Sequence, residues 1–585
     1  MTKNKKGVSL TKYLLLAIAC FFTFCKESTA QTFANTDFEY GVYKSQPRKW
    51  SIEGEGENYS ADLDSTISYQ GKKSLHISLK NAQIFIFIAI PSHLIAGKTI
   101  EVNAFYKSSE NSLNAMLLFN SPTDKKTVFS TKADPSNKDW QPLNNKASFP
   151  KTYPSDRLLL ALTAQGNGEF WFDHVQITID GKEYGNAAAD FREPSAAEIK
   201  NLNNKLIPIK GLDVQSVASD IKPLSKIIKD NTILALGENS HGSSTIYKLK
   251  LKLIKYLVEQ QKYTVFALEM PTVEADNIND YIQSGRGSKS DVIKNLTYPS
   301  WQTHEMVDII EWIKAFNTSH EKKVAFRGFD MQNGDSALLA MKIFAQAHDH
   351  ILLEKITELE QRYATQNKTQ DDFGYIDHKA KEISIYLGST SYAQVTAQRL
   401  EKIRHYASIF IQSAALIHDP SQSKSRDICM AENIDWIVKN SGPETKIIVS
   451  GDNTHISKAS GKMGSVLSGI YNEKYLAVGF TYNTGSYSAY GAKKYYEVYP
   501  SYPGTYEYLF SKSRSKNFIL DIRKNHGLQF LNHPSGFRSI GSRPQETTQF
   551  AEINITDHFD IVIYIEHSDH TTRLQIADNE NSNKE

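Results

Sequence analysis

The spacing of apolar residues divides the chain into two parts with different periods. Between residues 31 and 182, short runs rich in β-branched and aromatic residues, such as 82–90 and 168–179, are separated by clusters of Gly, Asn, Pro, Ser and Asp. Many short strands separated by turn residues are typical of a β-sandwich. We therefore predict an all-β sandwich domain over residues 31–182. Residues 183–200 have no strand pattern and are predicted to form a linker.

One of these strands, "IFIFIAI", is apolar on both of its faces. Because side chains alternate across a strand, Phe85 and Phe87 lie on one face and Ile84, Ile86 and Ile88 on the other. We expect an inner strand that is covered on both sides.

After residue 200, strand-like runs alternate with helical stretches. The run "TILAL" precedes "TIYKLKLKLIKYLVEQQ", in which apolar residues recur at helical spacing. This alternation predicts an α/β domain over residues 201–585, with a mostly parallel central sheet flanked by helices. Residues 335–440 have mostly helical patterning and are predicted to be a helical insertion.

The N-terminus has the pattern of a signal peptide. Four lysines precede an apolar stretch over residues 13–24, and small residues end at Ala30. We predict a signal peptide over residues 1–30, cleavage near Ala30, and export to the periplasm, the cell surface or the medium. A retained anchor is the alternative, and Cys20 and Cys25 leave a lipid anchor open. No stretch is long and apolar enough for a comfortable transmembrane helix, so we do not expect the chain to span a membrane.

The net charge limits the classes of partner that we expect, and the cysteine content limits the number of disulfides. The formal net charge is +2, which argues against a nucleic-acid-binding surface. Beyond the predicted leader, Cys429 is the one cysteine in the sequence, so an exported form would have no disulfide framework.

Four predicted strands end in polar side chains. These are Glu238 and His241 after the first strand, Glu269 on the second, Asp330 and Gln332 on the third, and Asp452, Asn453 and His455 after the fourth. Ligands of open parallel sheets bind beyond the carboxyl ends of the strands. Clustered carboxylates repel each other and lose hydration when buried, which favours a functional site over ordinary helix caps and turns.

Histidines and carboxylates in one cluster are suited to hydrolysis by activated water. A histidine can take a proton from water, while a carboxylate fixes its tautomer and raises its basicity. A serine nucleophile is disfavoured, because the sequence has no G-x-S-x-G motif and Ser240 lies in no such elbow. The same side chains would be acceptable ligands for a divalent metal, but their spacing matches no zinc motif, and we expect no metal or other cofactor. A non-catalytic surface protein that binds a glycan or a cofactor is the alternative of another class.

Several motifs occur in an order that resembles the erythromycin esterase family. They are "GENSHG", "TVFALEMP", "YPSWQTHEMVDIIEWIKAFN", "VAFRGFDMQ", "RDICMAENIDWI" and "GDNTHI", within about residues 195–570. The resemblance implies an enzyme that hydrolyses a carboxylic ester or macrolactone, with a small-molecule ester or lactone as its partner. It implies that His241 is the general base, that Glu238 is the acid of the first motif, and that Glu269 lines the site.

The resemblance also indicates residues that would hold the substrate. Arg426 matches a basic residue before the "MAEN" helix, and His455 matches the second histidine of the family's H-N-x-H motif. Asp452 stands where that motif has its first histidine, and Lys250 stands where an arginine is frequent in the family. We add Asp330 to this set because of its place at a strand end. Both departures affect residues that would hold the substrate, so the identity of the ester stays open.

The N-terminal part loosely resembles the jelly-roll carbohydrate-binding modules of exported bacterial enzymes. The segments "FWFDHVQI" and "GKKSLHI" carry this resemblance. It implies a glycan as a second partner, for which Trp171 is a candidate platform.

Overall fold

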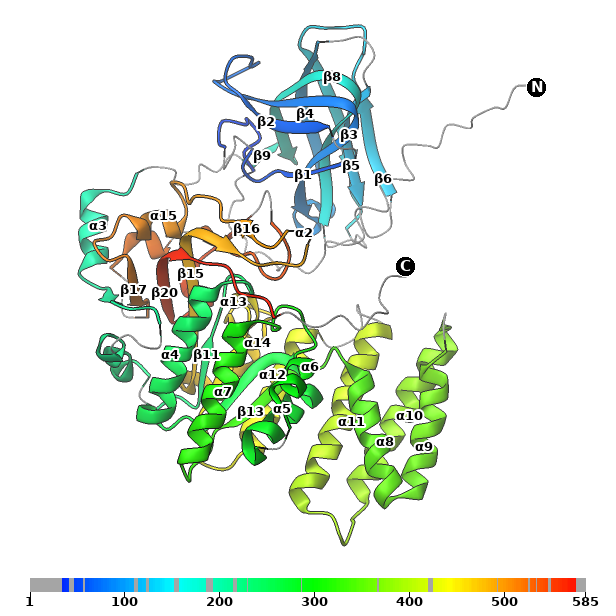
Figure 1. The fold of residues 1–585 in the computed structure, drawn as a ribbon. Coiled ribbons are helices and arrows are strands. Elements are labelled where there is room, and N and C mark those ends of the chain that lie inside the picture. The colour runs from blue at the N-terminus through cyan, green and yellow to red at the C-terminus, as the bar shows by residue number, and fades with distance from the viewer. Residues whose placement is uncertain are drawn as a thin grey trace. The chain divides into compact units, whose positions relative to one another are not determined.

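The computed structural model divides the chain into two compact units. It describes residues 34–574 apart from 42–46, 56–57, 110–113, 122–125, 152–156, 186–192, 214–217, 229, 286, 366–367, 419–424, 492, 524–526, 533 and 546–548. The N-terminal unit comprises Met1–Glu193, Tyr502–Gly504 and Gln545–Gln549, and the C-terminal unit comprises the rest (Figure 1). The predicted signal peptide and its cleavage site lie outside the described residues, as do residues 186–192 of the predicted linker.

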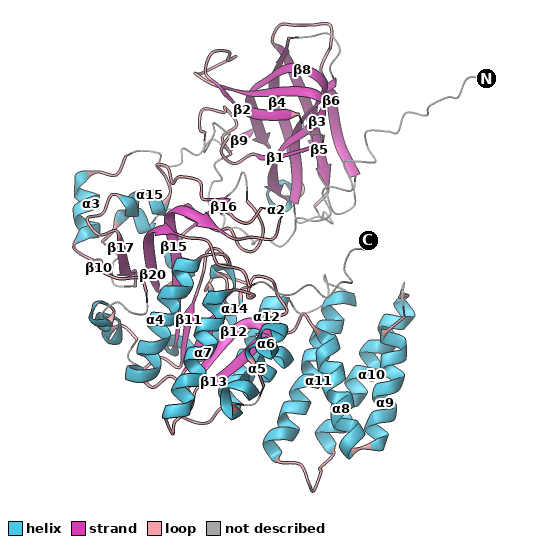
Figure 2. Cartoon of the chain, in the orientation of Figure 1, coloured by secondary structure: helices cyan, strands magenta, loops and turns pink. Residues whose placement is uncertain are grey.

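The N-terminal unit is built from antiparallel strands (Figure 2). They are β1 (Ser51–Glu55), β2 (Tyr59–Asp64), β3 (Ser74–Pro91), β4 (Thr99–Ser108), β5 (Asn114–Ser121), β6 (Lys126–Lys132), β7 (Gln141–Ser148), β8 (Arg157–Ile179) and β9 (Lys182–Tyr184), with the short helix α2 (Ser92–Ile95). The long strands β3 and β8 pair along most of their length. The first half of β8 also pairs with β5 and its second half with β4, so these two strands connect the two ends of the unit's sheet.

The expectation that β3 is covered on both faces is wrong for the face that bears Phe85 and Phe87. Ile84 and Ile86 are fully buried in the core of the unit, whereas both phenylalanines stay partly exposed. Phe87 packs against a small apolar cluster around Met116. The face of β3 that bears the two phenylalanines is therefore only partly covered.

The C-terminal unit contains a mixed sheet. In spatial order its strands are β10 (Ile207–Pro208), β17 (Asn517–Asp521), β20 (Ile561–Ser568), β15 (Tyr475–Tyr487), β11 (Ile233–Leu236), β14 (Ile447–Ser450), β12 (Val265–Pro271) and β13 (Ala325–Asp330). Neighbours from β20 to β13 are parallel. β17 and β10 run antiparallel at one edge, and β16 (Tyr496–Glu497) pairs antiparallel with the end of β15.

The prediction of a mostly parallel sheet holds for the strands from β20 to β13, but the sheet as a whole is mixed, because β17, β10 and β16 run antiparallel. In β17, Phe518 and Leu520 belong to one apolar cluster and Ile519 to another, so the strand is covered on both faces. A strand buried on both faces is a continuous apolar run in either direction, and its composition therefore does not reveal its orientation.

Helices cover both faces of this sheet. They are α3 (Ala196–Asn203), α4 (Ser244–Gln261), α5 (Thr272–Ser284), α6 (Lys289–Asn295), α7 (His304–Ser319), α12 (Arg426–Asn440), α13 (Asn453–Ile456), α14 (Met463–Tyr471), α15 (Tyr506–Ser511) and α16 (Ile555–His558). Alternate residues of β11 enter two different clusters: Leu234 and Leu236 pack with α4 and α7, whereas Ile233 and Ala235 pack with α12 and α14. Both faces of β11 are therefore buried. A short ribbon of β18 (Ser535–Arg538) and β19 (Phe550–Ile553) completes the unit.

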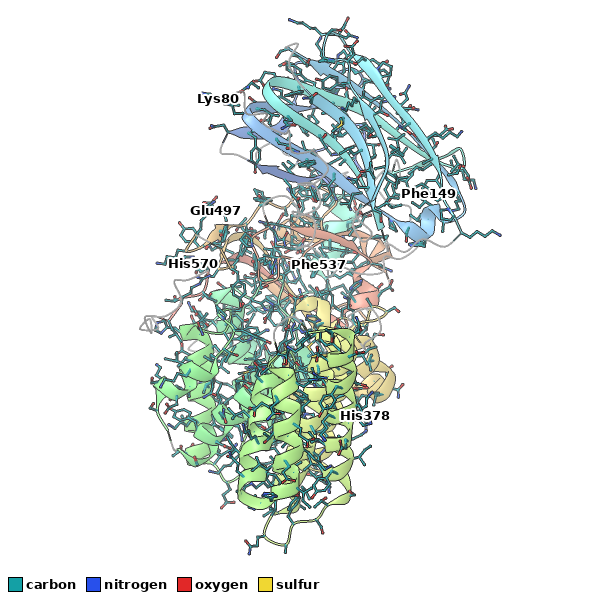
Figure 3. The ribbon with its side chains drawn as sticks, turned by 90° about the vertical axis from the view of Figure 1, so that its right-hand side faces the viewer. Lys80, Phe149, His378, Glu497, Phe537 and His570 are labelled. Carbon is teal, nitrogen blue, oxygen red and sulfur yellow. The ribbon has the colours of Figure 1, made fainter. Side chains whose placement is uncertain are left out.

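Four helices between β13 and α12 form a separate bundle with its own apolar core. They are α8 (Gly334–His348), α9 (His350–Tyr363), α10 (Gln370–Ser389, on which Figure 3 labels His378) and α11 (Ala397–His418). Helix α12 lies within the predicted insertion 335–440, yet most of its apolar face packs with the sheet. Among the described residues, no helix is long and apolar enough to cross a membrane.

Candidate active site

The polar side chains singled out from the sequence lie at the carboxyl ends of four adjacent strands. β11, β14, β12 and β13 are consecutive neighbours and all parallel, so their carboxyl ends lie side by side. Glu238 and Asp452 each come two residues after such a strand, Glu269 lies within β12, and Asp330 ends β13. The fold therefore gathers all four carboxylates at the carboxyl ends of the parallel strands, where ligands of α/β sheets bind.

The loop after β11 passes too close to its neighbours for side chains at two positions. A Cβ on Gly237 would lie 2.1 Å from Asn453 Oδ1, and one on Gly242 would lie 1.8 Å from the carbonyl oxygen of Ser488. The loop is held by a hydrogen bond from Asn453 N–H to the carbonyl of Glu238 (2.8 Å). The glycines of "GENSHG" thus allow a tightly packed loop that presents Glu238 and His241.

Glu238 is fully buried and accepts three side-chain donors. His241 Nδ1 lies 2.8 Å from its Oε1, and the Tyr247 hydroxyl donates to the same oxygen at 2.8 Å. The Lys250 ammonium pairs with Oε2 and also donates to Ser450 Oγ at 2.9 Å. Tyr247 and Lys250 are three residues apart on α4, so they project from one face of that helix. Burial raises the pKa of Glu238, but the charges of Lys250 and His241 outweigh this effect and lower it.

The position of His241 favours proton transfer at Nε2. With Nδ1 bonded to Glu238, Nε2 faces Asp452, whose Oδ2 lies 4.0 Å away. The imidazole packs edge-on against the ring of Trp301, at 5.1 Å between centroids, and its side chain is 13% exposed. Trp301 in turn donates from Nε1 to the carbonyl of Glu269 at 2.9 Å. The ring is therefore fixed on one side and open on the other.

The acids around His241 change its basicity. Burial alone lowers the pKa of His241, but the hydrogen bond to Glu238 and the charges of Glu238, Glu269 and Asp452 outweigh it and raise the pKa to about 9. The Glu238–Lys250 pair is also affected by burial, which lowers the pKa of Lys250 despite its carboxylate partner.

A second histidine lies on the other side of Glu269. His455 Nδ1 is 2.9 Å from Asp427 Oδ1, and its Nε2 is 3.0 Å from Arg426 Nη1 and 3.5 Å from Glu269 Oε1. With Nδ1–H donated to Asp427, Nε2 accepts from Arg426 in the neutral ring and faces Glu269 as a donor in the charged ring. Burial lowers the pKa of His455, but the charges of Glu269 and Asp427 outweigh it, so the pKa is raised.

Arg426 links the carboxylates of two strands. Its Nη2 donates to Glu269 Oε1 at 2.9 Å and to Asp330 Oδ2 at 2.8 Å, while Nε donates to Asp330 Oδ1 at 3.2 Å. Glu269 Oε2 accepts the backbone N–H of Asp452 at 2.8 Å. Burial raises the pKa of Glu269, but the charges of His455, Arg426 and His241 outweigh it and lower the pKa to about 2. Glu269 is thus an anion between two histidines.

The eight residues singled out from the sequence form one continuous network of contacts. They are Glu238, His241, Lys250, Glu269, Asp330, Arg426, Asp452 and His455. Of the other polar groups named at these strand ends, Gln332 lies 3.5 Å from the Tyr298 hydroxyl, and Asn453 holds the backbone of Phe480. Ser240 is fully buried, and its Oγ accepts the backbone N–H of Gly242.

Sequence reasoning missed three residues of the network. Asp427 orients His455, Tyr247 donates to Glu238, and the Tyr298 hydroxyl lies 3.3 Å from Asp330 Oδ2. Tyr247 lies one helical turn before Lys250 on α4, so helical spacing could have indicated it. Asp427 directly follows Arg426 in the first turn of α12, and because adjacent helical residues do not share a face, its signal is its place in the "RDICMAENIDWI" motif. Tyr298 lies between α6 and α7 and is the first residue of the "YPSWQTHEMVDIIEWIKAFN" motif, which could have indicated it.

Within the part of the chain that the structure describes, no three His, Cys, Asp or Glu side chains are arranged to hold a metal ion. Three carboxylates of this site form ion pairs with basic side chains. Lys250 faces Glu238, and Arg426 faces Glu269 and Asp330.

Comparison with known proteins assigns the family. A family model for erythromycin esterase matches residues 258–568, more than half of the chain. The chain belongs to the erythromycin esterase family. Membership makes it an ester-hydrolysing enzyme. The match contains Glu269, Arg426 and His455, whereas Glu238 and His241 precede it.

Curated relatives of this erythromycin esterase family member include two esterases. Erythromycin esterase type II of Escherichia coli is 25% identical over 417 residues, which cover 63% of this chain and 97% of the relative. Erythromycin esterase type I of Escherichia coli is 24% identical over 310 residues, covering 45% and 73%. A putative hydrolase of Bacillus subtilis is 25% identical over 283 residues, covering 43% and 62%.

Solved structures support the fold of the esterase unit. A Bacillus cereus protein has a TM-score of 0.60 at 25% identity, over 66% of this chain and all of the other. A succinoglycan biosynthesis protein has a TM-score of 0.57 at 22% identity, over 65% of this chain and all of the other. A xylan-binding domain from Paenibacillus barcinonensis covers 25% of this chain at 15% identity with a TM-score of 0.19, which supports no conclusion about a ligand.

Proposed function

We propose that the protein hydrolyses a carboxylic ester or lactone with a water molecule that His241 activates. The observation that carries this proposal is the fixed position of the His241 ring: Nδ1 is bonded to a buried carboxylate at 2.8 Å, and Nε2 is directed toward the strand-end cluster. A carboxylate on one ring nitrogen makes the other a stronger base.

In the reaction, neutral His241 takes a proton from water at Nε2 as the water oxygen attacks the ester carbonyl. The carbonyl π electrons move to oxygen, and the resulting anion needs positive charge beside it. Arg426 is a cation on the Glu269 side of the cluster, where its Nη2 lies 2.9 Å from Glu269 Oε1. When the ester C–O bond breaks, the imidazolium returns its proton to the leaving alkoxide. Glu238 stabilises the imidazolium between these steps.

The raised pKa of His241 implies a preference for alkaline pH. A histidine with a pKa of about 9 is neutral in about one molecule in a hundred at pH 7. The active form of the base becomes more abundant as the pH rises toward 9. Hydrolysis is therefore proposed to be faster in mildly alkaline solution.

The names of the curated relatives favour a macrolactone as the substrate, and the two departures from the family pattern bear on this choice. Lys250 keeps the positive charge next to Glu238 that an arginine would supply. Asp452 places a carboxylate 4.0 Å from His241 Nε2, where a histidine would be neutral or positive. A substrate with a hydrogen-bond donor near its ester would suit this carboxylate.

The test is a panel of esters incubated with the purified protein and followed by mass spectrometry. The panel contains a macrolide, an acetylated sugar and simple alkyl and aryl esters. Addition of one water to a lactone, or release of acid and alcohol from an open-chain ester, supports the proposal. No hydrolysis of any ester between pH 7 and 9.5 would contradict it.

We also propose that the protein is exported and that its N-terminal unit binds a glycan. Export rests on the lysine-rich, apolar pattern of residues 1–30. For a glycan, the N-terminal unit offers Tyr69, which is 43% exposed, stacks on Phe105 at 3.6 Å between centroids and meets Trp140 edge-on. Trp171 is less suited to a platform, because it is 8% exposed and its Nε1 donates to Asp64. Measuring the binding of soluble polysaccharides to the wild-type protein and to Tyr69→Ala tests the proposal of a glycan ligand.

A further inference from the structure

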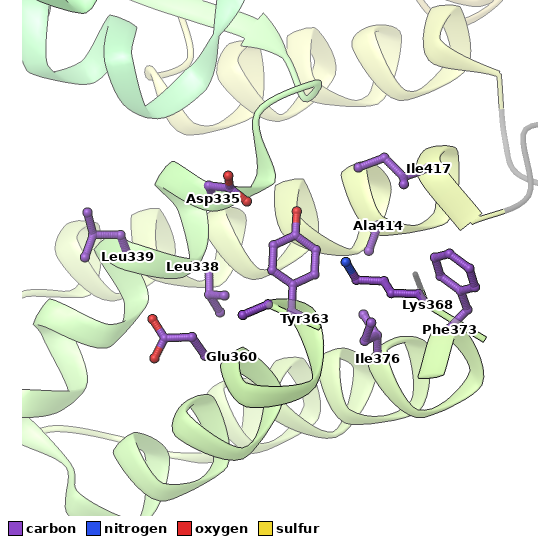
Figure 4. Close-up of a pocket in the computed structure, with 11 residues that line it drawn as sticks. Asp335, Leu338, Leu339, Glu360, Tyr363, Lys368, Phe373, Ile376, Ala414 and Ile417 are labelled. Carbon is purple, nitrogen blue, oxygen red and sulfur yellow. The ribbon is translucent and has the colours of Figure 1, made fainter. Parts of the chain in front are cut away.

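The helical bundle of the esterase unit contains a cavity at one of its ends. Its volume is about 420 Å³, within the range of about 300–1,000 Å³ of small-molecule pockets. All four helices contribute to its lining, among them Leu338 and Leu339 from α8, Tyr363 from α9, Ile376 from α10, and Ala414 and Ile417 from α11 (Figure 4).

The cavity lies at the end of the bundle that is connected to the active site. Consecutive helices joined by short loops run antiparallel. The first turns of α8 and α10 and the last turns of α9 and α11 therefore share one end, and this is the end that the chain enters from β13. All of the lining residues come from these turns or directly adjoin them.

Apolar packing joins this end of the bundle to two residues of the site. Met331 directly follows Asp330, and Cys429 follows Arg426 by three residues on α12. Both belong to the apolar cluster that contains the lining residue Ala414. One apolar cluster thus contains both cavity-lining residues and neighbours in sequence of Asp330 and Arg426.

The lining of the cavity is mainly apolar, with Asp335, Glu360 and Lys368 as its charged members. Figure 4 shows the ring of Tyr363 in the middle of the lining residues, with Leu338 on one side and Ile376 and Ala414 on the other. The Tyr363 hydroxyl is hydrogen-bonded to Asp335, so this polar group is already satisfied. At the rim, Leu339 and Ile417 are 56% and 57% exposed. Exposed aliphatic side chains beside an apolar cavity favour an apolar ligand.

We propose that this cavity binds the apolar portion of the ester substrate, a long alkyl chain or an aliphatic ring attached to the scissile ester. The inference rests on the proposed ester hydrolysis and adds a substrate class to it. The site at the strand ends is strongly charged, so it has little apolar surface for such a group. The cavity supplies that surface at the end of the bundle that follows β13, and its lining residue Asp335 comes five residues after Asp330 in the sequence.

The test compares two substitutions on the same helix. Leu339 and Ile343 are both on α8 and both 56% exposed, but Leu339 lines the cavity and Ile343 does not. Leu339→Asp places a charge at the cavity rim, and Ile343→Asp is the matched control. Because both positions are exposed, both variants are expected to fold, which circular dichroism and thermal melting will check.

Two series of esters provide the kinetic measurement: p-nitrophenyl esters from acetate to decanoate, and alkyl acetates from ethyl to decyl. A buried methylene group contributes about fourfold in affinity, so kcat/KM is expected to rise with length in at least one series. Leu339→Asp is expected to remove most of this rise, by tenfold or more for the longest ester, and to leave ethyl acetate unchanged. Ile343→Asp is expected to behave as the wild-type protein. Equal length dependence in all three proteins would overturn the inference.

Calorimetric binding of decanoate separates this inference from the proposed function. Weaker binding to Leu339→Asp than to the wild type and Ile343→Asp would support the cavity even if no ester were hydrolysed. Ester hydrolysis together with equal decanoate binding by the three proteins would overturn the cavity and leave the proposed function standing.

Discussion

Lys250 and Glu238 form an ion pair in which neither side chain is exposed to solvent. The pair lies behind the catalytic candidate His241, which shares the carboxylate of Glu238. A buried ion pair contributes little net stability compared with apolar residues, but removal of one partner leaves an uncompensated charge. The stability of the fold around Glu238 therefore depends on the charges of both side chains.

Lys250→Met is expected to lower the free energy of unfolding by about 3–5 kcal/mol, because Glu238 loses its buried cation. Urea denaturation followed by circular dichroism measures this change. Lys250→Arg keeps the charge and is expected to cost less. A loss below about 1 kcal/mol for Lys250→Met would contradict the assignment of a charged pair.

His241→Ala is expected to lower kcat/KM for ester hydrolysis by about a hundredfold or more, the contribution of a positioned general base. The fold is expected to persist, because the imidazole lies at the edge of the sheet and not in its apolar core. His378→Ala, an exposed position on α10, is the control and is expected to leave the rate unchanged. Retention of more than a tenth of the rate in His241→Ala would remove it as the base.

The pH profile of hydrolysis is expected to follow the titration of His241. Because the neutral ring is the base and its pKa is raised to about 9, kcat/KM is expected to rise up to about pH 9. Glu238→Gln removes the largest stabilising partner of the imidazolium, so the midpoint is expected to move to lower pH. Initial rates of both proteins between pH 6 and 10 measure the shift. Identical midpoints would show that another group controls the profile.

Folding stability is expected to fall at alkaline pH through the same histidine. Its folded pKa of about 9 exceeds the ordinary histidine value of 6.5, so its contribution is fully present below pH 6.5 and is lost as the pH rises through 9. The whole contribution is on the order of 3 kcal/mol. The difference in unfolding free energy between the wild type and His241→Ala is expected to shrink between pH 6.5 and 9. A constant difference over that interval would contradict the raised pKa.

Glu269 is expected to affect folding stability at acidic pH. Its pKa is lowered from 4.5 to about 2, so its contribution to stability is present above pH 4.5 and is lost as the pH falls through 2. Glu269→Gln is expected to lower stability at neutral pH and to weaken the loss of stability between pH 4.5 and 2. Thermal melting of both proteins across this interval provides the measurement.

Removal of metal ions is expected to leave hydrolysis unchanged, because His241 and Glu238 suffice to activate water in the proposed mechanism. Dialysis against a chelator, followed by the ester assay with and without added zinc, tests this. Loss of activity on dialysis and recovery with zinc would favour a metal-dependent hydrolase that uses the same cluster.

The sequence by itself determined which strand-end residues are candidates for the site. An apolar run that ends abruptly in acids and histidines indicates a buried strand and the chemistry at its end, because both signals are local. For this reason Glu238, Glu269, Asp330 and Asp452 could be identified from their positions alone. The β period of the first part and the α/β alternation of the second are local signals of the same kind.

The tertiary structure decided how these pieces are arranged. The order β11, β14, β12, β13 pairs strands that are up to about 200 residues apart in the sequence, and no local period encodes such pairing. The direction of β17 depends on its neighbour in the sheet and not on its composition. The role of Asp427 and the cavity of the bundle exist only once separate helices pack together, because each is defined by contacts between elements.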